Sequence, residues 1–166
     1  LYFTITSMDT ILLGYSTVDV ICNGDSTGEI QLSSVGGVGM HSYTIDGAIY
    51  QDSLIDGLQA GQYHVFVTDS VQCNSDTIVI DVNESSAIQI NYTVVDVLCN
   101  GDSTGELYLS STGGIGTHTY SIDGTIHQNT IVDSLWADQY YIVATDSMQC
   151  VSDTSIVDIN EPLLIQ

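Results

Sequence analysis

Four cysteines are the residues of this sequence most suited to covalent chemistry. Cys22 and Cys73 lie 51 positions apart, and Cys99 and Cys150 repeat that spacing. The sequence lacks the closely spaced Cys and His pairs of a zinc site, so we expect one disulfide in each half, Cys22–Cys73 and Cys99–Cys150. Such bonds imply an oxidising compartment outside the cytoplasm. The alternative is four buried free thiols in a reduced protein.

Acidic side chains offer a second kind of chemistry, the binding of a hard cation. Asp25 and Glu29 share a glycine-rich loop, and Asp102 and Glu106 share its counterpart. Carboxylate oxygens suit Ca²⁺, although the spacing is not that of an EF-hand. The alternative is a polar turn in which Asp and Ser side chains cap backbone amides. We therefore expect no required cofactor, with Ca²⁺ as the candidate ligand. Three further aspartates on neighbouring strands are candidates to complete the site: Asp19, Asp69 and Asp146.

The histidines and the single tryptophan have no partners at a motif spacing. His41 and His118 each follow a glycine-rich turn, and we expect both to be surface strand residues. Trp136 has Gln59 as its counterpart in the other half, so it is not expected in the core. Its alternatives are packing at a repeat junction and contact with a ligand. No nucleophile, base and orienting group form a recognisable arrangement, so we do not expect an enzyme.

The charge of the chain excludes several classes of partner. Among 166 residues there are 21 acidic residues and no Lys or Arg, which gives a formal net charge of −21. Binding to nucleic acid, P-loop chemistry and attraction to an anionic membrane all need cationic side chains. No apolar stretch has the length of about 20 residues that a membrane helix requires. We expect neither nucleic-acid binding nor membrane insertion.

An internal repeat of 77 residues organises the chain. The segment Cys22–Glu29 recurs as Cys99–Glu106, and Asn83-Glu84 recurs as Asn160-Glu161. This alignment predicts full repeats over 9–85 and 86–162. Residues 1–8 align with the end of a preceding repeat, and 163–166 align with the start of a following one. We expect the chain to be a segment of a longer tandem array.

Period-two alternation and β-branched residues predict that each repeat is made of strands. In the first repeat we expect strands near 16–22, 28–34, 41–46, 48–55, 62–69 and 76–82, with one more near 9–13. Ile30 and Leu32 are predicted to face the core, and so are Val18 and Val20. Two sheets with such inner faces form an all-β sandwich in each repeat.

A longer motif runs through each repeat. It is carried by Cys22–Ile30, Gly36–Tyr43, Leu58–Asp69, Cys73 and, in the second repeat, Ile159–Pro162. These residues resemble a known family, the SprB repeat of large Bacteroidota surface adhesins. The resemblance implies tandem immunoglobulin-like sandwiches on an extracellular, cell-surface protein that is linked with gliding motility and type IX secretion. Two turns depart from the pattern, at Ala137-Asp138 and at Ser85.

A further pattern is Asp followed by Ser or Thr and then a small or aliphatic residue. It resembles the acceptor for O-glycosylation in the same bacterial phylum, and ordinary turn chemistry is the alternative. The candidate acceptors are Thr10, Ser26, Ser53, Ser70, Thr77, Ser103, Ser134 and Ser147.

These observations lead to three hypotheses of function. The first is a structural stalk segment of a long, acidic, repetitive extracellular adhesin or surface filament, which presents or mediates attachment. Its partners would be neighbouring repeats, lateral filament partners, and surface polysaccharide or an abiotic surface. The second is a carbohydrate- or Ca²⁺-dependent binding module. The third is a fibre subunit that polymerises by adding the segment Tyr2–Thr6 to another molecule as a strand.

Overall fold

The computed structural model describes residues 9–164 and divides the chain into two compact units, Leu1–Glu84 and Ser85–Gln166. The sequence places the same division one residue later, after residue 85. The segment proposed for strand addition, Tyr2–Thr6, lies outside the described residues. The described part of the chain contains strands and turns but no helix, and therefore no helix long and apolar enough to cross a membrane.

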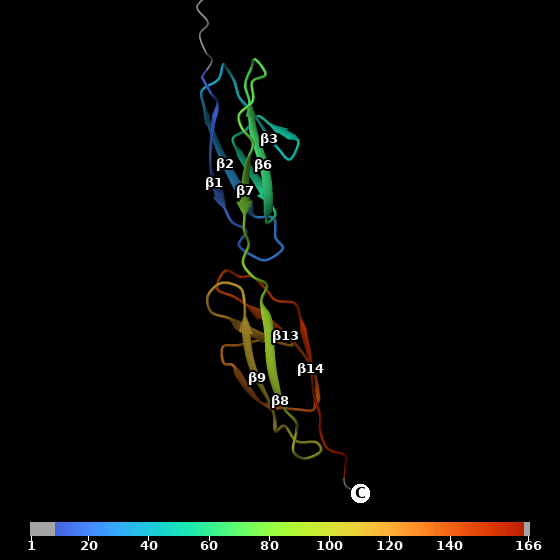
Figure 1. Ribbon diagram of the computed structural model, residues 1–166. Coiled ribbons are helices and arrows are strands. Elements are labelled where there is room, and N and C mark those ends of the chain that lie inside the picture. Colours follow the sequence, from blue (N-terminus) through green and yellow to red (C-terminus); the bar gives the residue numbers. More distant parts are fainter. Residues whose placement is uncertain (1–8, 165–166) are drawn as a thin grey trace, which may run out of the picture. The chain divides into compact units, whose positions relative to one another are not determined.

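The first unit has seven strands in two antiparallel sheets (Figure 1). One sheet has the order β1-β2-β5, and the other has the order β4-β3-β6-β7. The strands are β1 (Leu12–Val18), β2 (Gly28–Val35), β3 (Ser42–Ile45), β4 (Ala48–Tyr50), β5 (Leu54–Leu58), β6 (Gly61–Thr68) and β7 (Ile78–Val82).

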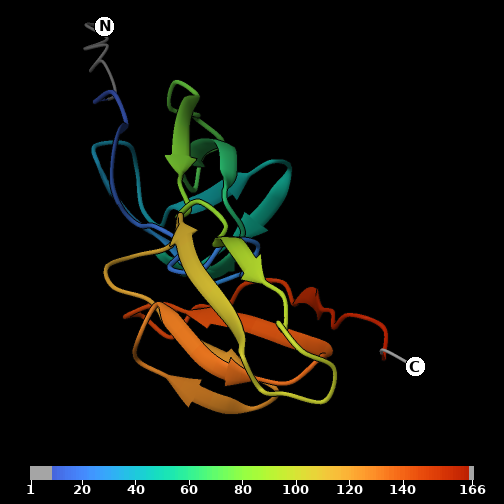
Figure 2. The same ribbon diagram turned by 90° about the horizontal axis from the view of Figure 1, so that it is seen from below.

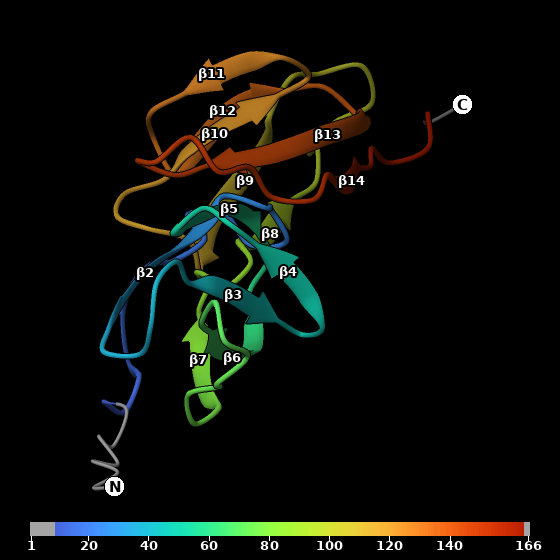
Figure 3. The same cartoon turned by 90° about the horizontal axis from the view of Figure 1, so that it is seen from above.

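The second unit repeats this topology, and each of its strands begins and ends 77 residues after its counterpart. Its sheets have the orders β8-β9-β12 and β11-β10-β13-β14. Figure 2 shows β8 and β9 lying across the strands of the other sheet, and Figure 3 shows β10, β11, β13 and β14 side by side. The strands are β8 (Gln89–Val95), β9 (Gly105–Thr112), β10 (Thr119–Ile122), β11 (Thr125–His127), β12 (Ile131–Leu135), β13 (Asp138–Thr145) and β14 (Ser155–Ile159).

The core of each unit lies between its two sheets. Ile30 and Leu32 on β2 pack in one cluster with Val65 and Val67 on β6, as alternation along each strand predicts. The expectation for Val18 is wrong, because this residue is 51% exposed at the end of the edge strand β1. Val20 is buried, since the chain turns inward there and forms an isolated bridge to Glu84.

One predicted strand is in fact two. The segment 48–55 contains β4, which pairs with β3, and the start of β5, which pairs with β2 in the other sheet. The chain crosses between the sheets at residues 51–53, where the Ser53 carbonyl accepts a hydrogen bond from the Leu32 amide at 2.7 Å. Because of this crossing, β5, β6 and β7 run opposite to the direction expected if 48–55 were a single strand.

The chain enters and leaves each sandwich at opposite ends. Residues 9–11, the turn 36–41 and the loop 69–77 lie together at what we call the entry end, where the Gly37 amide donates to the Asp9 carbonyl at 3.1 Å. The loop 19–27 and residues 82–84 lie together at the exit end, where the Val20 amide donates to the Asn83 carbonyl at 2.8 Å. In the second unit the same ends are formed by 86–88, 113–118 and 146–154, and by 96–104 and 159–161. Figure 1 allows the two ends of the first unit to be followed along β6 and β7.

Candidate functional site at the ends of each unit

A glutamate holds the loop at the exit end. The Gly24 amide donates to Glu84 Oε2 at 2.6 Å, and the Gly101 amide donates to Glu161 Oε2 at 2.7 Å. Hydrogen bonds from an amide to a carboxylate are stronger than neutral ones. Sequence reasoning missed this role, although the recurrence of Asn-Glu at both places was the available signal. The exit-end loop of each unit, which holds Cys22 or Cys99, is therefore hydrogen-bonded to the last residues of that unit.

An aspartate holds the loop at the entry end of the first unit. Asp69 is buried, and its Oδ1 accepts hydrogen bonds from the amides of Val71 and Cys73, both at 2.9 Å. Its Oδ2 accepts one from the Val38 amide at 3.0 Å, which joins the glycine-rich turn to the loop. The Cys73 amide contributes most to a pKa of Asp69 below the ordinary value, and burial opposes the shift.

Asp146 has the same role in the second unit. It accepts hydrogen bonds from the amides of Ile115, Met148 and Cys150 at 2.7 to 2.9 Å. Burial acts to raise the pKa of Asp146, but these donors together outweigh burial and lower it. Each aspartate is thus a structural anchor that remains ionised because backbone amides surround it.

The glycine-rich turn is shaped by its contact with the entering chain. Gly36 has φ of +88° and its Cα faces the carbonyl of Thr10, so a Cβ there would collide with backbone. Gly113 is in the same situation, with φ of +83° against the carbonyl of Ala87. Only glycine fits both the backbone conformation and the close approach.

The predicted cation site is not assembled. Within residues 9–164, no group of three or more His, Cys, Asp or Glu side chains is placed to hold a metal ion. Asp25 and Asp102 are exposed in turns where their amides donate to the carbonyls of Cys22 and Cys99, and Glu29 lies on β2. Glu106 accepts a hydrogen bond from the Tyr108 hydroxyl at 2.6 Å, which raises the pKa of Tyr108.

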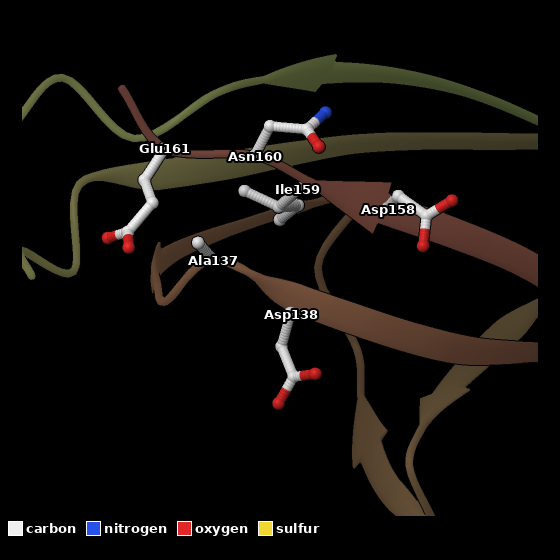
Figure 4. A pocket seen from close by; sticks show the side chains of 6 residues that line it. All are labelled: Ala137, Asp138, Asp158, Ile159, Asn160 and Glu161. Carbon is white, nitrogen blue, oxygen red and sulfur yellow. The ribbon is translucent and has the colours of Figure 1, made fainter. Parts of the chain in front are cut away.

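A hollow of about 500 Å³ at the exit end of the second unit is also lined by acidic side chains, but their carboxylates do not converge. Asp138, Asp158 and Glu161 contribute to its lining. Figure 4 shows their carboxylates pointing in different directions rather than toward one centre. Asp158 accepts a hydrogen bond from the Gln139 side chain at 3.0 Å. The arrangement does not provide the converging oxygens that Ca²⁺ requires.

The expected disulfides Cys22–Cys73 and Cys99–Cys150 are wrong. Cys73 and Cys99 are free and exposed, whereas Cys22 and Cys150 are disulfide-bonded. The reason lies in the topology of a single unit, because Cys22 belongs to the exit end and Cys73 to the entry end. The eight residues of β6 separate these ends by about 25 Å, whereas a disulfide needs Cα atoms within about 7 Å.

The histidines are not simple surface residues. Ser34 Oγ contacts His41 Nδ1 at 2.7 Å and the Tyr43 hydroxyl at 3.0 Å, and both histidine and serine are half-buried. His118 forms the same cluster with Ser111 and Tyr120. The Nε2 atoms of both histidines are buried and have no hydrogen-bond partner among the described residues. A serine and a histidine are therefore adjacent, but within residues 9–164 neither imidazole forms the hydrogen bond to a carboxylate that orients a catalytic histidine.

Three exposed aromatic side chains of the second unit, Trp136, Tyr108 and Tyr141, do not form one platform. Trp136 is 58% exposed and follows β12 at the exit end, consistent with its prediction outside the core. Tyr108 lies on β9 and Tyr141 lies on β13, in different sheets, and both point away from the core. The three residues therefore lie on separate faces of the unit.

The candidate glycosylation sites differ in how accessible their hydroxyls are. Ser70 and Ser147 are exposed, but their hydroxyls are engaged by the amides of Met40 and Thr117 at 2.8 and 3.0 Å. The Ser53 hydroxyl accepts a hydrogen bond from Gln31 at 3.0 Å. Ser103 is half-buried, and the others are exposed: Thr10, Ser26, Thr77 and Ser134.

Comparison with known proteins supports both the family and the fold. The SprB repeat family matches residues 14–48 and 91–125, one stretch in each unit, which confirms the resemblance. No curated protein matches the sequence.

Three solved structures are similar in fold, and each is 11% identical to this chain over 90% of its length. The three N-terminal domains of the bacteriophage RB49 outer capsid protein Hoc align with a TM-score of 0.50. A C-terminal fragment of intimin aligns with a TM-score of 0.42, and the fibronectin(III)-like modules of Clostridium thermocellum CbhA with 0.39. The chain spans 59% of the phage chain, 64% of the intimin chain and 94% of the CbhA chain. The predicted all-β, immunoglobulin-like sandwich is confirmed.

Proposed function

We propose that this chain is a structural stalk segment of a long, acidic extracellular repeat protein that presents or mediates attachment at a surface. The observation that carries the proposal is that the chain enters each sandwich at one end and leaves at the opposite end. In the first unit, the Gly37 amide bonds to the Asp9 carbonyl at the entry end, and Val20 bonds to Asn83 at the exit end. A repeat with this connectivity adds its own length to an array.

The charge of the chain supports the same role. The net charge is −21 and no Lys or Arg is present, so like charges repel along the whole chain. In the described residues the one ion pair involves a histidine, between His64 and Asp46 at 3.3 Å. Repulsion that is not relieved by cations favours extension over collapse. We therefore propose an extended array rather than a compact assembly.

The remaining features of the stalk follow from the SprB match and belong to the proposal. They are an extracellular, cell-surface location, type IX secretion and a link with gliding motility. The pattern of Asp followed by Ser or Thr adds O-glycosylation to the proposal. The partners would be neighbouring repeats, lateral filament partners, and surface polysaccharide or an abiotic surface. The proposed role is mechanical and not enzymatic. The alternative of a carbohydrate- or Ca²⁺-dependent module gains no support from residues 9–164, where neither an aromatic platform nor a cation cluster is assembled.

Small-angle scattering of tandem fusions tests the proposal. The chain would be compared with fusions that contain two and three copies of residues 9–162. We expect the maximum dimension to grow linearly, by about 30–40 Å for each 77-residue repeat, from the strand rise and the loops at each end. A radius of gyration that grows only as about the 0.38 power of chain length would show compaction and refute the stalk.

Calorimetry on the same chains addresses binding directly. Titration with Ca²⁺ and with a panel of surface polysaccharides separates a passive stalk from a binding module. A stalk segment gives no heat with Ca²⁺. Saturable Ca²⁺ binding by the chain would favour the module over the stalk.

A further inference from the structure

The exit-end loop of the second unit contains a dipeptide that is chemically reactive in itself. Asn100 is followed by Gly101, which has φ of +79° and no atom within 4 Å of the position of a Cβ. Since glycine carries no side chain, nothing shields its backbone nitrogen from the side chain of the preceding asparagine. The sequence contains Asn-Gly at one other place, Asn23-Gly24, in the matching loop of the first unit. Both loops therefore carry the two groups that react in the deamidation of asparagine.

Deamidation of this pair needs no reagent besides water. The backbone nitrogen of Gly101 attacks Cγ of Asn100, a bond forms between these two atoms, and the bond from Cγ to Nδ2 breaks. Ammonia leaves with the proton that the Gly101 amide has lost. Water then opens the cyclic succinimide at either of its carbonyls, which leaves aspartate or isoaspartate in place of asparagine. Asn100 and Gly101 are both exposed, so water reaches them.

A single carboxylate holds both reacting nitrogens. The Gly101 amide donates to Glu161 Oε2 at 2.7 Å, and Asn100 Nδ2 donates to Glu161 Oε1 at 2.8 Å. Asn100 Nδ2 also donates to the Pro162 carbonyl at 3.1 Å. The nucleophile and the leaving group of the reaction are thus hydrogen-bonded to the same side chain.

We propose that Asn100-Gly101 is a latent deamidation site and that the Glu161 carboxylate keeps it in the unreacted form. Attack requires the Gly101 nitrogen to lose its proton, and the negative charge that then develops lies beside a carboxylate of the same sign. Attack also breaks a hydrogen bond to a charged acceptor, which is stronger than a neutral one. Ring closure further requires the Asn100 side chain to turn, whereas its hydrogen bonds hold Nδ2 at Glu161 and Pro162. Each of these effects slows the reaction.

The first unit has the same contact at the corresponding place. The Gly24 amide donates to Glu84 Oε2 at 2.6 Å, and Asn23, Gly24 and Glu84 recur 77 positions later as Asn100, Gly101 and Glu161. Each unit therefore supplies its own glutamate to its own Asn-Gly pair. The proposal extends to Asn23-Gly24, with Glu84 as the protecting residue.

Deamidation opens the exit end irreversibly. The product places a new carboxylate beside that of Glu161, and two adjacent carboxylates repel each other. The chain has no Lys or Arg to neutralise them. Isoaspartate also lengthens the main chain, which moves the Gly101 amide away from its acceptor. The loop then loses the hydrogen bonds that join it to the last residues of the unit.

Ageing of the full chain at mildly alkaline pH tests the proposal, with wild type and Glu161→Gln incubated in parallel. Reduction and cleavage after glutamate place Asn100 in peptide 85–106 and Asn23 in peptide 1–29. Mass spectrometry follows the conversion of amide to acid in each peptide, and fragment ions assign the modified asparagine. We expect Asn100 to deamidate about 10- to 100-fold faster in the variant, the factor that corresponds to one hydrogen bond with a charged partner. The rate at Asn23 is expected to stay unchanged.

Two further variants separate the carboxylate from general loosening of the loop. Thr104→Val removes the hydroxyl that accepts a hydrogen bond from the Leu98 amide at 2.9 Å in the same loop, and it leaves Glu161 in place. We expect this variant to deamidate at Asn100 at a rate close to that of wild type. Glu84→Gln is the reciprocal variant, and we expect it to accelerate deamidation in the first unit alone.

The expected consequence of the reaction is tested with Asn100→Asp, which reproduces the aspartate product. We expect faster amide hydrogen exchange at Gly101 in this variant than in wild type, because the second carboxylate displaces Glu161. Unchanged exchange would show that deamidation does not open the exit end.

The ageing experiment has several results that would overturn the inference. A rate at Asn100 in Glu161→Gln that equals the wild-type rate would show that the carboxylate does not protect, and a lower rate would show that it assists the attack as a base. Equal acceleration by Thr104→Val would assign the effect to mobility of the loop. Equal acceleration at Asn23 in Glu161→Gln would show that the substitution does not act within its own unit.

Discussion

Replacement of the glycine at the entry-end turn gives the sharpest prediction about the fold. In the variant Gly36→Ala with Gly113→Ala, each new Cβ meets a backbone carbonyl, and φ is already +88° and +83°. A left-handed conformation costs an alanine about 1–2 kcal/mol, and forcing extra volume into a packed contact costs about 1–3 kcal/mol. We therefore expect a loss of about 2–5 kcal/mol in the free energy of unfolding of each unit.

A loss of that size is easily measured. For a unit of this length, about 1 kcal/mol corresponds to about 4–8 °C in Tm, so a loss of about 3 kcal/mol lowers Tm by about 12–24 °C. Thermal unfolding followed by circular dichroism on the full chain, under non-reducing conditions, provides the assay.

Two control variants separate the causes. Gly24→Ala with Gly101→Ala has φ of +80° and +79° but no atom within 4 Å of either new Cβ, so only the conformational cost of about 1–2 kcal/mol applies. Gly61→Ala meets nothing within 4 Å, and the second unit already carries Asp138 at that position. We expect Gly61→Ala to leave Tm unchanged or slightly higher. Equal effects of the turn variant and the Gly24 control would refute the collision argument.

Three further substitutions test the anchors and the core. In Asp146→Asn we expect the loss of an acid-dependent contribution to stability. The pKa of Asp146 is lower in the folded chain than its ordinary value of 3.8, so the carboxylate stabilises the fold above that pH. This contribution is lost as the pH falls through the lowered pKa. Urea unfolding midpoints measured across this pH range would show the loss in wild type and its absence in the variant. In Glu161→Gln we expect faster amide hydrogen exchange at Gly101, whose acceptor loses its charge, with little change in global stability. In Ile142→Ala, at 0% exposure, we expect a loss of about 2–5 kcal/mol by urea unfolding, against almost none in Ile126→Ala at 71% exposure.

Each of these substitutions has a result that would contradict its premise. A pH dependence of the Asp146→Asn variant that matches wild type would show that the buried carboxylate is not the acid-sensitive group. Unchanged exchange at Gly101 would show that the glutamate does not hold the exit-end loop. Equal losses at Ile142 and Ile126 would place the core elsewhere than between the two sheets.

Sequence periodicity predicts the parts of this fold that depend on local alternation. Ile30 and Leu32 are buried on β2 and Gln31 between them is exposed, because a strand in a two-layer sandwich shows one face to the core and one to solvent. Val18 follows the same alternation but is exposed, since β1 is an edge strand that ends there. Alternation does not indicate whether the opposite sheet still covers the end of a strand.

The anchors of the two loops were harder to predict for a different reason. Glu84 contacts Gly24 across 60 residues, and Asp69 contacts Val38 across 31 residues. A carboxylate in a loop has the same local pattern whether it faces solvent or accepts backbone amides. The comparison of the two repeats marks these residues as recurring. Only the folded backbone shows which amides donate hydrogen bonds to their carboxylates.

The positions of the cysteines depend on how many times the chain reverses direction. If 48–55 were one strand, the predicted strands would alternate in direction from 16–22 to 62–69. Strands 16–22 and 62–69 would then run in the same direction and finish at the same end of the sandwich. Cys22 and Cys73 would then be neighbours. The crossing at Ser53 splits this segment into β4 and β5, which adds one reversal and sends β6 toward the entry end. The signal for this split was present, because 51–53 reads Gln-Asp-Ser and its counterpart 128–130 reads Gln-Asn-Thr, three consecutive polar residues in each repeat. A cysteine at each end of each unit is the direct consequence of that additional reversal, and the distance between the two ends makes a bond between the two cysteines of one unit impossible.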